Sequence, residues 1–248
     1  MRPLLLSAFA LLVISITPVA AFPPAIHLHP TPAATLHNAT DILDELAAIP
    51  LNGIPRTLLA EAQGVAIIPR VVKAGFVFAG QGGHGVVLAR EKNGAWGEPV
   101  FINIGGASVG FQAGIESTDV VLIFRTRRSL DRLLAGKGKI TLGVDAAVAA
   151  GPIGRQAEAG TDARLSTEIL SYSRSRGLFA GVALDGAVIH ADAGSNILFR
   201  EDRHPDTRTH AEELRATLSA LSGGTPLPRR QMVVPAGAVL PSVMPGRP

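Results

Sequence analysis

The sequence predicts an α+β domain, in which a curled, mostly antiparallel β-sheet packs with helices from the N- and C-terminal parts of the chain. Two observations lead to this prediction. Short runs of β-branched residues separated by glycine follow one another between positions 65 and 188, as is typical of antiparallel strands. Segments with apolar residues at a 3.6-residue spacing lie before and after these runs, as expected for amphipathic helices. The aromatic content is 4% and glycine accounts for 27 of 248 residues, which favours an aliphatic core with close backbone approaches.

The first helix is expected to begin at Thr40, with Asp41 and Asp44 in its first turns, and to end at Pro50. Pro55 is suited to the first turn of a second short helix. Residues 22–39 are rich in proline and histidine and are predicted to form an extended leader. The folded domain is predicted over residues 40–203.

The expected strands are followed by a terminal helix over residues 204–223, where Thr209 and Glu212 have capping-box spacing. One helix is expected to interrupt the strands, with Thr126 at its start and Gly136 just past its end. Residues 224–248 are rich in proline and predicted to be disordered. The expected strands cover residues 65–68, 76–79, 85–89, 100–104, 108–115, 120–124, 140–147 and 178–184.

The chain begins with the order of features that defines a secretory signal. Arg2, an apolar run over residues 4–16 and the small residues Ala20 and Ala21 predict that residues 1–21 are removed after Ala21. A retained anchor is the alternative, although the run is shorter than the roughly 20 residues that span a bilayer. Without cysteine, the chain has no disulfide or lipidated cysteine. We therefore expect an exported protein, periplasmic or secreted, with non-covalent peripheral association with a membrane.

Two glycine motifs suggest chemistry that their surroundings do not favour. Gly80, Gly82 and Gly85 have the spacing of a dinucleotide-binding loop, but a strand-like run follows where a helix is required, so a tight turn or hairpin is predicted. Ser108 lies in a G-x-S-x-G motif that is also followed by strand-like sequence. Because an acid (Asp145 or Asp162) and His190 follow in a suitable order, a serine hydrolase using Ser108 stays open as an alternative. The pairs His27/His29 and His190/Asp192 lack further ligands, so neither a metal nor another cofactor is expected.

Basic residues are concentrated in the middle of the chain. The net charge of +3 is too small to indicate nucleic-acid binding, but residues 70–139 carry ten basic and five acidic side chains. If they share a surface, they would bind phosphate headgroups, each contributing about 1 kcal/mol at an anionic membrane; an ordinary solvated face is the alternative. The candidate headgroup-binding residues are Lys73, Arg90, Lys92, Arg125, Arg127, Arg128, Arg132, Lys137 and Lys139.

A second basic segment includes Tyr172, Arg174 and Arg176. In a strand these three side chains would lie on one face. Two roles are open for the arginines: contact with an anion, or structural ion pairs. The structural role is favoured, with partners expected among the acids Asp145, Asp162 and Glu168.

Residues 64–90 and 168–186 together resemble the SYLF-domain family, whose eukaryotic members include lipid-binding adaptors and yeast endocytic actin-binding proteins. The resemblance covers roughly residues 40–200. It implies a binding domain for acidic lipids more strongly than an enzyme. Further matching positions are Trp96, Pro99, Gly106, Gly110, Gly114, Asp119, Gly136, Lys137, Gly143, Asp145 and residues 151–155.

The function expected from this resemblance is non-catalytic binding of acidic phospholipid headgroups by an exported envelope protein. A scaffold that binds another envelope protein through the same basic face is a further alternative. Eukaryotic relatives are described as binding phosphoinositides through a basic amphipathic segment ahead of the domain, whereas this chain has Asp41, Asp44 and Glu45 there. The resemblance implies phosphatidylinositol binding, but this departure leaves phosphoinositide specificity open. Because an exported protein would not normally meet actin, actin is not expected as a partner, and neither is nucleic acid.

Overall fold

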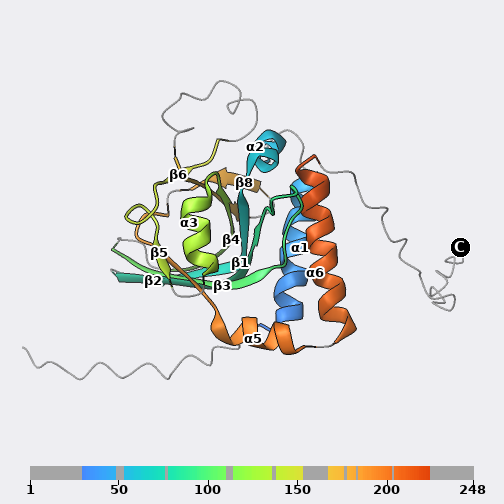
Figure 1. Ribbon diagram of the computed structural model, residues 1–248. Helices are drawn as coiled ribbons and strands as arrows, with labels where there is room; N and C mark the ends of the chain where they lie inside the picture. Colours follow the sequence, from blue (N-terminus) through green and yellow to red (C-terminus); the bar gives the residue numbers. More distant parts are fainter. Residues whose placement is uncertain are drawn as a thin grey trace, which may run out of the picture.

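In the part of the chain that the structure describes, nine strands form one curled sheet, which is antiparallel except where β6 pairs with β7. The computed structural model describes residues 30–48, 53–75, 78–109, 114–135, 138–152, 167–175, 178–182, 184–202 and 204–223. The strands follow the order β5-β9-β3-β2-β1-β4-β7-β6, and β8 pairs with β7. With helices from both ends of the chain packed on this sheet (Figure 1), the predicted α+β architecture is confirmed.

The strands and helices have the following bounds. The strands are β1 (Gly64–Gly75), β2 (Phe78–Ala89), β3 (Val100–Val109), β4 (Gly114–Phe124), β5 (Lys139–Thr141), β6 (Val148–Ala150), β7 (Ile169–Ser175), β8 (Leu178–Gly181) and β9 (Val188–Ala191). The helices are α1 (Pro32–Ala48), α2 (Arg56–Glu61), α3 (Arg127–Leu134), α5 (Ala193–Glu201) and α6 (Pro205–Leu221).

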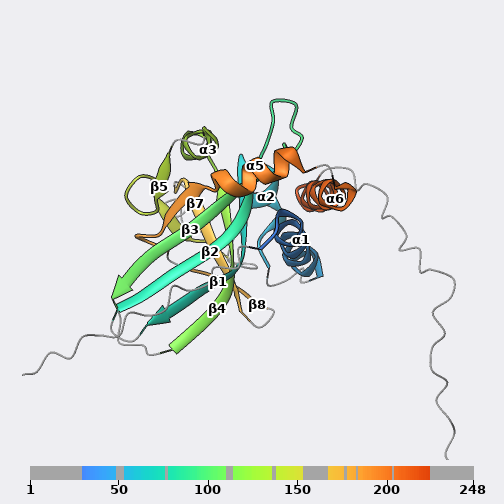
Figure 2. The ribbon, with the colours of Figure 1, turned by 90° about the horizontal axis from the view of Figure 1, so that it is seen from below.

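Alternation along the central strands gives the sheet two buried faces. Val65 and Ile67 of β1 belong to one apolar cluster, together with buried residues of α1, α2 and α6. Their neighbours Ala66 and Ile68 belong to a second cluster, which contains Leu130 and Leu133 of α3 and residues of β5 and β9. α1 and α6 lie side by side over the first face in both views (Figures 1 and 2).

Helix α1 begins at Pro32, eight residues before the predicted start at Thr40, inside the segment expected to be an extended leader. Thr31 explains the difference: its Oγ1 accepts a hydrogen bond from the Ala34 amide (3.2 Å), and Pro32 occupies the first turn, where its missing N–H costs nothing. Thr40 lies in the helix interior, where its hydroxyl donates to the Leu36 carbonyl oxygen.

The strands β1 and β2 are each twelve residues long, so the shorter strands predicted in this region were wrong. β1 continues through Pro69 because the register shifts there, and at such a bulge no ladder bond needs the missing proline N–H. Arg70 adopts a positive φ of 49° at this bulge, and its amide donates to Asp119 Oδ1 (2.8 Å). Gly80 to Gly85 lie inside β2, which pairs antiparallel with the preceding strand β1, so the predicted hairpin is confirmed, whereas a turn at these glycines was wrong.

Other boundaries differ from the prediction where strands are short or joined by connections. The predicted strand at 108–115 spans the end of β3 and the start of β4, and that at 140–147 contains only the end of β5. β6, β9 and α5 were not among the expected elements, and β7 was considered as a strand only in placing Tyr172 and Arg174 on one face. α6 begins at Pro205, so Thr209 lies inside the helix and donates to the Pro205 carbonyl oxygen. The predicted apolar stripe of Leu214, Leu218 and Leu221 is buried.

Some predictions concern residues outside the described ranges: the signal at 1–21, residues 22–29 of the leader with His27 and His29, and the tail at 224–248. Among the residues that are described, no helix is both long enough and apolar enough to cross a membrane.

Candidate functional site

The short helix α3 presents cations at its N-terminal end. Leu130 and Leu133 are buried against the sheet, which leaves the other side of the helix facing solvent. Thr126 occupies the N-cap position but its side chain makes no capping hydrogen bond, and the first turn contains no acidic residue. It contains Arg127 and Arg128 instead. Because the amides and dipole of a helix N-terminus already favour an anion, adjacent arginines strengthen that preference.

The arginines around α3 differ in how far they are already paired. Arg127 binds Asp131 Oδ1 through Nη2 (3.0 Å) and donates through Nη1 to the Arg90 carbonyl oxygen (2.5 Å). Arg132 lies 3.7 Å from Asp145 Oδ1. The Thr141 amide donates to Asp145 and lowers the pKa of that carboxyl, with a smaller contribution from Arg132.

Three other cations make no ion pair with any residue that the structure describes. Arg125 is half-buried, and Lys92 and Arg128 are exposed. Arg132 follows Arg128 by four residues, so the two share one side of α3. We call these five residues the basic surface: Lys92, Arg125, Arg127, Arg128 and Arg132.

Arg90 has a structural role and is not available to a ligand. Its guanidinium donates to the carbonyl oxygens of Leu59 (3.1 Å), Ala62 (3.0 Å) and Gly94 (2.8 Å), and lies 4.3 Å from the centre of the Trp96 ring. Burial lowers its pKa. Through these hydrogen bonds Arg90 links α2 and the residue that follows it to the turn between β2 and β3.

The structure separates Lys73 from the basic surface. Lys73 lies nine residues along β1 from Gly64, about 30 Å at 3.3 Å per residue, whereas Gly64 pairs with Phe124, next to Arg125. Lys73 instead lines a cavity of about 50 Å³ with Gln81 and Glu116. The predicted candidates therefore do not form one continuous patch.

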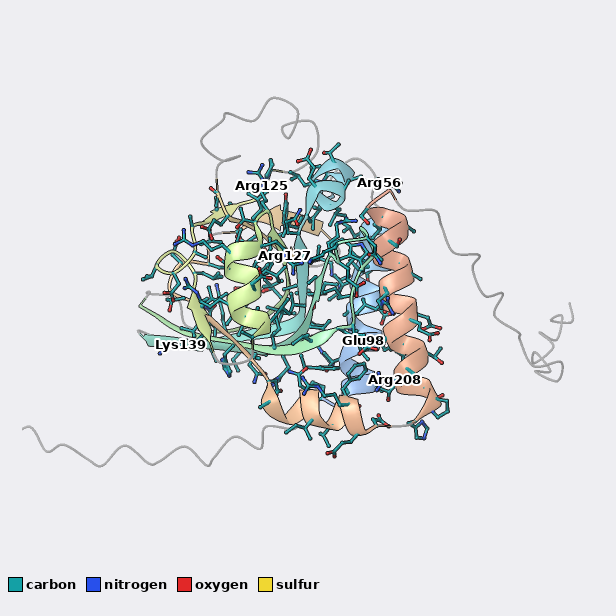
Figure 3. All side chains as sticks on the ribbon, viewed as in Figure 1. Arg56, Glu98, Arg125, Arg127, Lys139 and Arg208 are labelled. Carbon is teal, nitrogen blue, oxygen red and sulfur yellow. The ribbon has the colours of Figure 1, made fainter. Side chains whose placement is uncertain are left out.

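One predicted candidate, Lys139, lies apart from the basic surface, and one exposed arginine that was not predicted, Arg56, lies toward it. Lys139 is exposed on β5, well away from Arg125 and Arg127 (Figure 3), and Lys137 lies outside the described residues. Arg56, exposed on α2, lies toward the same end of the molecule as Arg125 and Arg127 (Figure 3). It was missed because it precedes the basic stretch, and only the packing of α2 beside Arg90 brings it to this end.

The backbone around Ser108 does not have the geometry of a nucleophile elbow. Ser108 lies within β3, whereas an elbow requires a sharp strand-to-helix turn. His190 of β9 pairs in register with Asn103, five residues from Ser108 along β3, or about 16 Å. The alternative of a serine hydrolase thus loses its structural basis.

Arg174 lies in β7 with Tyr172, and both side chains face α1, as predicted from the alternation. Arg174 binds Asp119 Oδ2 through Nε (2.8 Å) and Nη2 (2.5 Å), and it also contacts Glu45 of α1. Burial lowers the pKa of Arg174. The favoured structural role is confirmed, although its partners are different acids from those expected. Arg176 lies outside the described residues.

Histidine and acidic residues do not gather into a metal site in the part of the chain that is described. No group of three or more such side chains there is arranged to hold an ion. Asp192, which was considered with His190, instead caps α5 by accepting the Ser195 amide (3.1 Å).

Comparison with known proteins identifies the domain. The family model Ysc84, described as "Las17-binding protein actin regulator", matches residues 105–214. The human SH3 domain-containing YSC84-like protein 1 is 38% identical over 175 residues, which cover 71% of this chain and 47% of that protein. Its Xenopus laevis counterpart is 42% identical over 154 residues, covering 60% and 45%. The yeast (Saccharomyces cerevisiae) LAS seventeen-binding protein 3 is 42% identical over 151 residues, covering 60% and 32%.

These relatives are longer proteins, of which this chain spans about half or less. No solved structure matches the chain. The expectation that excluded actin finds no support, since the description of the matching family itself names an actin regulator. The matched residues include β4, α3, β7 and α5 and reach into α6, so they contain most of the basic surface. By its Ysc84 domain, the chain belongs to the SYLF-domain family.

Proposed function

We propose that this protein is a non-catalytic binding module that attaches to acidic phospholipid surfaces through the basic surface around α3. The observation that carries the proposal is the start of α3, where Arg127 and Arg128 lie beside helix amides that the Thr126 side chain does not cap. An anion placed there would interact favourably with the helix dipole and with both guanidinium groups. The proposal includes export of the chain and peripheral attachment to an envelope membrane.

Nearby acids limit the expected strength of binding. Asp131 neutralises part of Arg127, and Glu168 accepts a hydrogen bond from Ser129 within α3 (2.5 Å). Arg125, Arg128 and Lys92 are therefore the principal contributors. At about 1 kcal/mol for each basic residue near an anionic membrane, attachment would be weak to moderate and strongly dependent on salt.

The test is co-sedimentation of the protein with vesicles of phosphatidylcholine alone and of phosphatidylcholine mixed with phosphatidylserine, across a salt series. We expect binding to the anionic vesicles that fades as salt rises. Arg128→Glu removes one positive charge and adds a negative one, which should weaken binding by about 1–2 kcal/mol, or about 5- to 30-fold.

The matched control is Arg200→Glu. Arg200 is exposed near the end of α5, and α5 lies at the opposite end of the molecule from α2 (Figure 1). This variant has the same charge change, so it should bind vesicles nearly as well as the unmodified protein. Equal losses in the two variants would show that only net charge matters, and no binding to either vesicle would refute attachment to lipid.

A protein ligand is the second candidate, favoured by the description of the matching family as Las17-binding and actin-regulating. Direct titration with actin and with a Las17-type regulator would test whether that property extends to this chain. Saturable binding that is lost in Arg128→Glu, together with absence of vesicle binding, would replace the lipid proposal with this one.

A further inference from the structure

The sheet curls toward the face that carries the second apolar cluster. In the strand order, Ile140 of β5 and Ile189 of β9 lie at one end and Ile169 of β7 lies near the other, yet all three belong to this cluster. The two ends of the sheet therefore approach each other over one face, which is the concave side of a partly closed barrel. β1 to β4 run on past α1 and α6 (Figure 2). Ligand pockets occur preferentially where a barrel opens.

A cavity of about 50 Å³ lies on this concave side, with room for roughly four water molecules. Val71 and Val120, which belong to the second apolar cluster, line the cavity. Val182 and Leu184, from the connection between β8 and β9, line it as well. The remaining lining residues are polar. The cavity therefore combines an apolar wall with a polar one, as ligand sites commonly do.

The strand register brings the five polar lining residues to the same face of the sheet. Lys73 of β1 lies directly opposite Gln81 of β2 and Glu116 of β4. Thr118 follows Glu116 by two residues on β4, and Ser173 of β7 lies one diagonal step beyond Thr118. Directly opposite residues have Cβ atoms about 5 Å apart, and diagonal neighbours are about 7–8 Å apart. Gln81, Glu116 and Thr118 are therefore all within reach of the long Lys73 side chain.

The five polar side chains are not engaged by the rest of the described chain. Among the residues that the structure describes, none of the five makes a side-chain hydrogen bond or an ion pair, although Lys73 and Glu116 are neighbours. Four of them are half-buried, and Glu116 is exposed. Gly106 leaves space for one of them, because a Cβ atom there would lie 3.0 Å from Gln81 Nε2. Half-buried polar groups without a protein partner are available to water or to a ligand.

We propose that this cavity binds a small zwitterion in which a phosphate group lies next to an ammonium group, as in ethanolamine phosphate. Lys73, Gln81 and Thr118 donate hydrogen bonds to the phosphate, and the ammonium of Lys73 makes the strongest of these. Glu116 accepts a hydrogen bond from the ligand's ammonium at the exposed rim. Three donors suit the three terminal oxygens of a phosphate better than the two oxygens of a carboxylate.

The charges of the lining select a ligand that carries both signs. The cavity has one positive and one negative side chain, Lys73 and Glu116. A simple anion bound to Lys73 would be repelled by Glu116, and a simple cation bound to Glu116 would be repelled by Lys73. A zwitterion satisfies both side chains, which is the electrostatic complementarity that gives specificity.

This site is independent of the lipid attachment proposed for α3. Lys73 lies about 30 Å along β1 from the basic surface, so the two sites share no residue. The same chemistry occurs in free ethanolamine phosphate and in the headgroup of phosphatidylethanolamine. The experiments below separate these two sources.

Isothermal titration of the full chain with ethanolamine phosphate tests the proposal. We expect saturable binding that is tighter than binding of inorganic phosphate or of ethanolamine. Lys73→Gln should weaken it at least about 10-fold, since a hydrogen bond from a charged group is lost, and Thr118→Val should weaken it about 2- to 10-fold. Glu116→Gln should remove the preference over inorganic phosphate. The control Lys139→Gln removes the same charge from an exposed side chain of β5 outside the cavity and should bind normally.

Vesicles identify the source of the ligand. Arg128→Glu, which weakens the basic surface, is sedimented with vesicles of phosphatidylcholine alone and of phosphatidylcholine mixed with phosphatidylethanolamine. The quaternary ammonium of choline has no N–H to donate to Glu116, so phosphatidylcholine is the matched control lipid. Retention by the mixed vesicles that is lost on adding Lys73→Gln assigns the lipid headgroup, whereas binding of the free compound alone assigns a soluble ligand.

Two results would overturn the proposal. The first is the absence of saturable binding both to ethanolamine phosphate and to the mixed vesicles. If urea unfolding of the single and double variants of Lys73 and Glu116 then shows that the two residues stabilise each other, they form only an ion pair. The second is binding that is equally strong in Lys73→Gln, in Thr118→Val and in the unmodified protein, which would place the ligand elsewhere. Loss of binding to phosphatidylserine vesicles in Arg128→Glu bears only on the basic surface.

Discussion

Replacing Asp119 with alanine should destabilise the fold substantially, because this carboxylate joins three parts of the structure. Asp119 is buried in β4. It accepts hydrogen bonds from the Arg70 amide at the β1 bulge (2.8 Å) and from Arg174 of β7 (2.8 and 2.5 Å). Arg174 in turn contacts Glu45, which links the network to α1.

The size of the expected loss of stability depends on the groups that Asp119→Ala deprives of a hydrogen-bond acceptor. The Arg174 side chain is only 16% exposed, and it would keep Glu45 as its remaining partner; the Arg70 amide would lose its acceptor. Breaking a buried ion pair costs about 3–5 kcal/mol, and the remaining Glu45 places this case at the lower end, about 3 kcal/mol. For a domain of this size that corresponds to a fall in Tm of about 6–12 °C.

Thermal and urea unfolding followed by circular dichroism would measure the effect. Glu45→Ala is the control: its side chain is half exposed, so its loss should cost at most about 1 kcal/mol. Asp119→Ala combined with Arg174→Met should be less destabilising than the sum of the single changes, since no unpaired cation remains. If Asp119→Ala unfolds cooperatively within about 1 kcal/mol of the unmodified protein, the network does not stabilise the fold as argued.

Two further predictions concern other parts of the fold. Gly85→Ala should destabilise the protein by at least about 2 kcal/mol in urea unfolding, because its Cβ would lie 2.3 Å from a backbone oxygen. The control Gly82→Ala should be neutral or stabilising by up to about 1 kcal/mol. Equal effects of the two substitutions would contradict the packing argument. The His204 amide lowers the pKa of Asp202 below 3.8, with help from Thr207, so this carboxylate should stabilise the fold above about pH 4 and lose that effect as pH falls through its folded-state pKa. The difference in Tm between the unmodified protein and Asp202→Asn should shrink as the pH falls through the folded-state pKa of Asp202. A difference in Tm that stays constant with pH would contradict a stabilising role of the ionised carboxylate.

Local sequence patterns predicted the elements whose signals lie within a few residues. Leu214, Leu218 and Leu221 recur at helical spacing and are buried in α6, and the alternation that placed Tyr172 beside Arg174 holds in β7. The start of α1 was also present in the sequence, since Thr31 followed by Pro32 is a standard helix start. It was missed because the histidines and prolines around it indicated an extended segment.

The glycine-rich part of β2 shows why other predictions were wrong. Gly80, Gly82 and Gly85 break the apolar pattern as a turn would, yet all three pair with β3, and Gly80 and Gly82 also pair with β1. Strand pairing of this kind joins residues that are distant in sequence, so it overrides local propensity.

The sequence alone therefore determined the α+β class, the family resemblance and the concentration of cations between residues 70 and 139. Only the tertiary structure decided which cations are available. In the folded protein Arg90 holds α2, Arg174 pairs with Asp119, and Lys73 lies about 30 Å along β1 from the basic surface. The physical reason is that charge and periodicity are properties of a segment, whereas ion pairs and surfaces depend on which segments the sheet brings together.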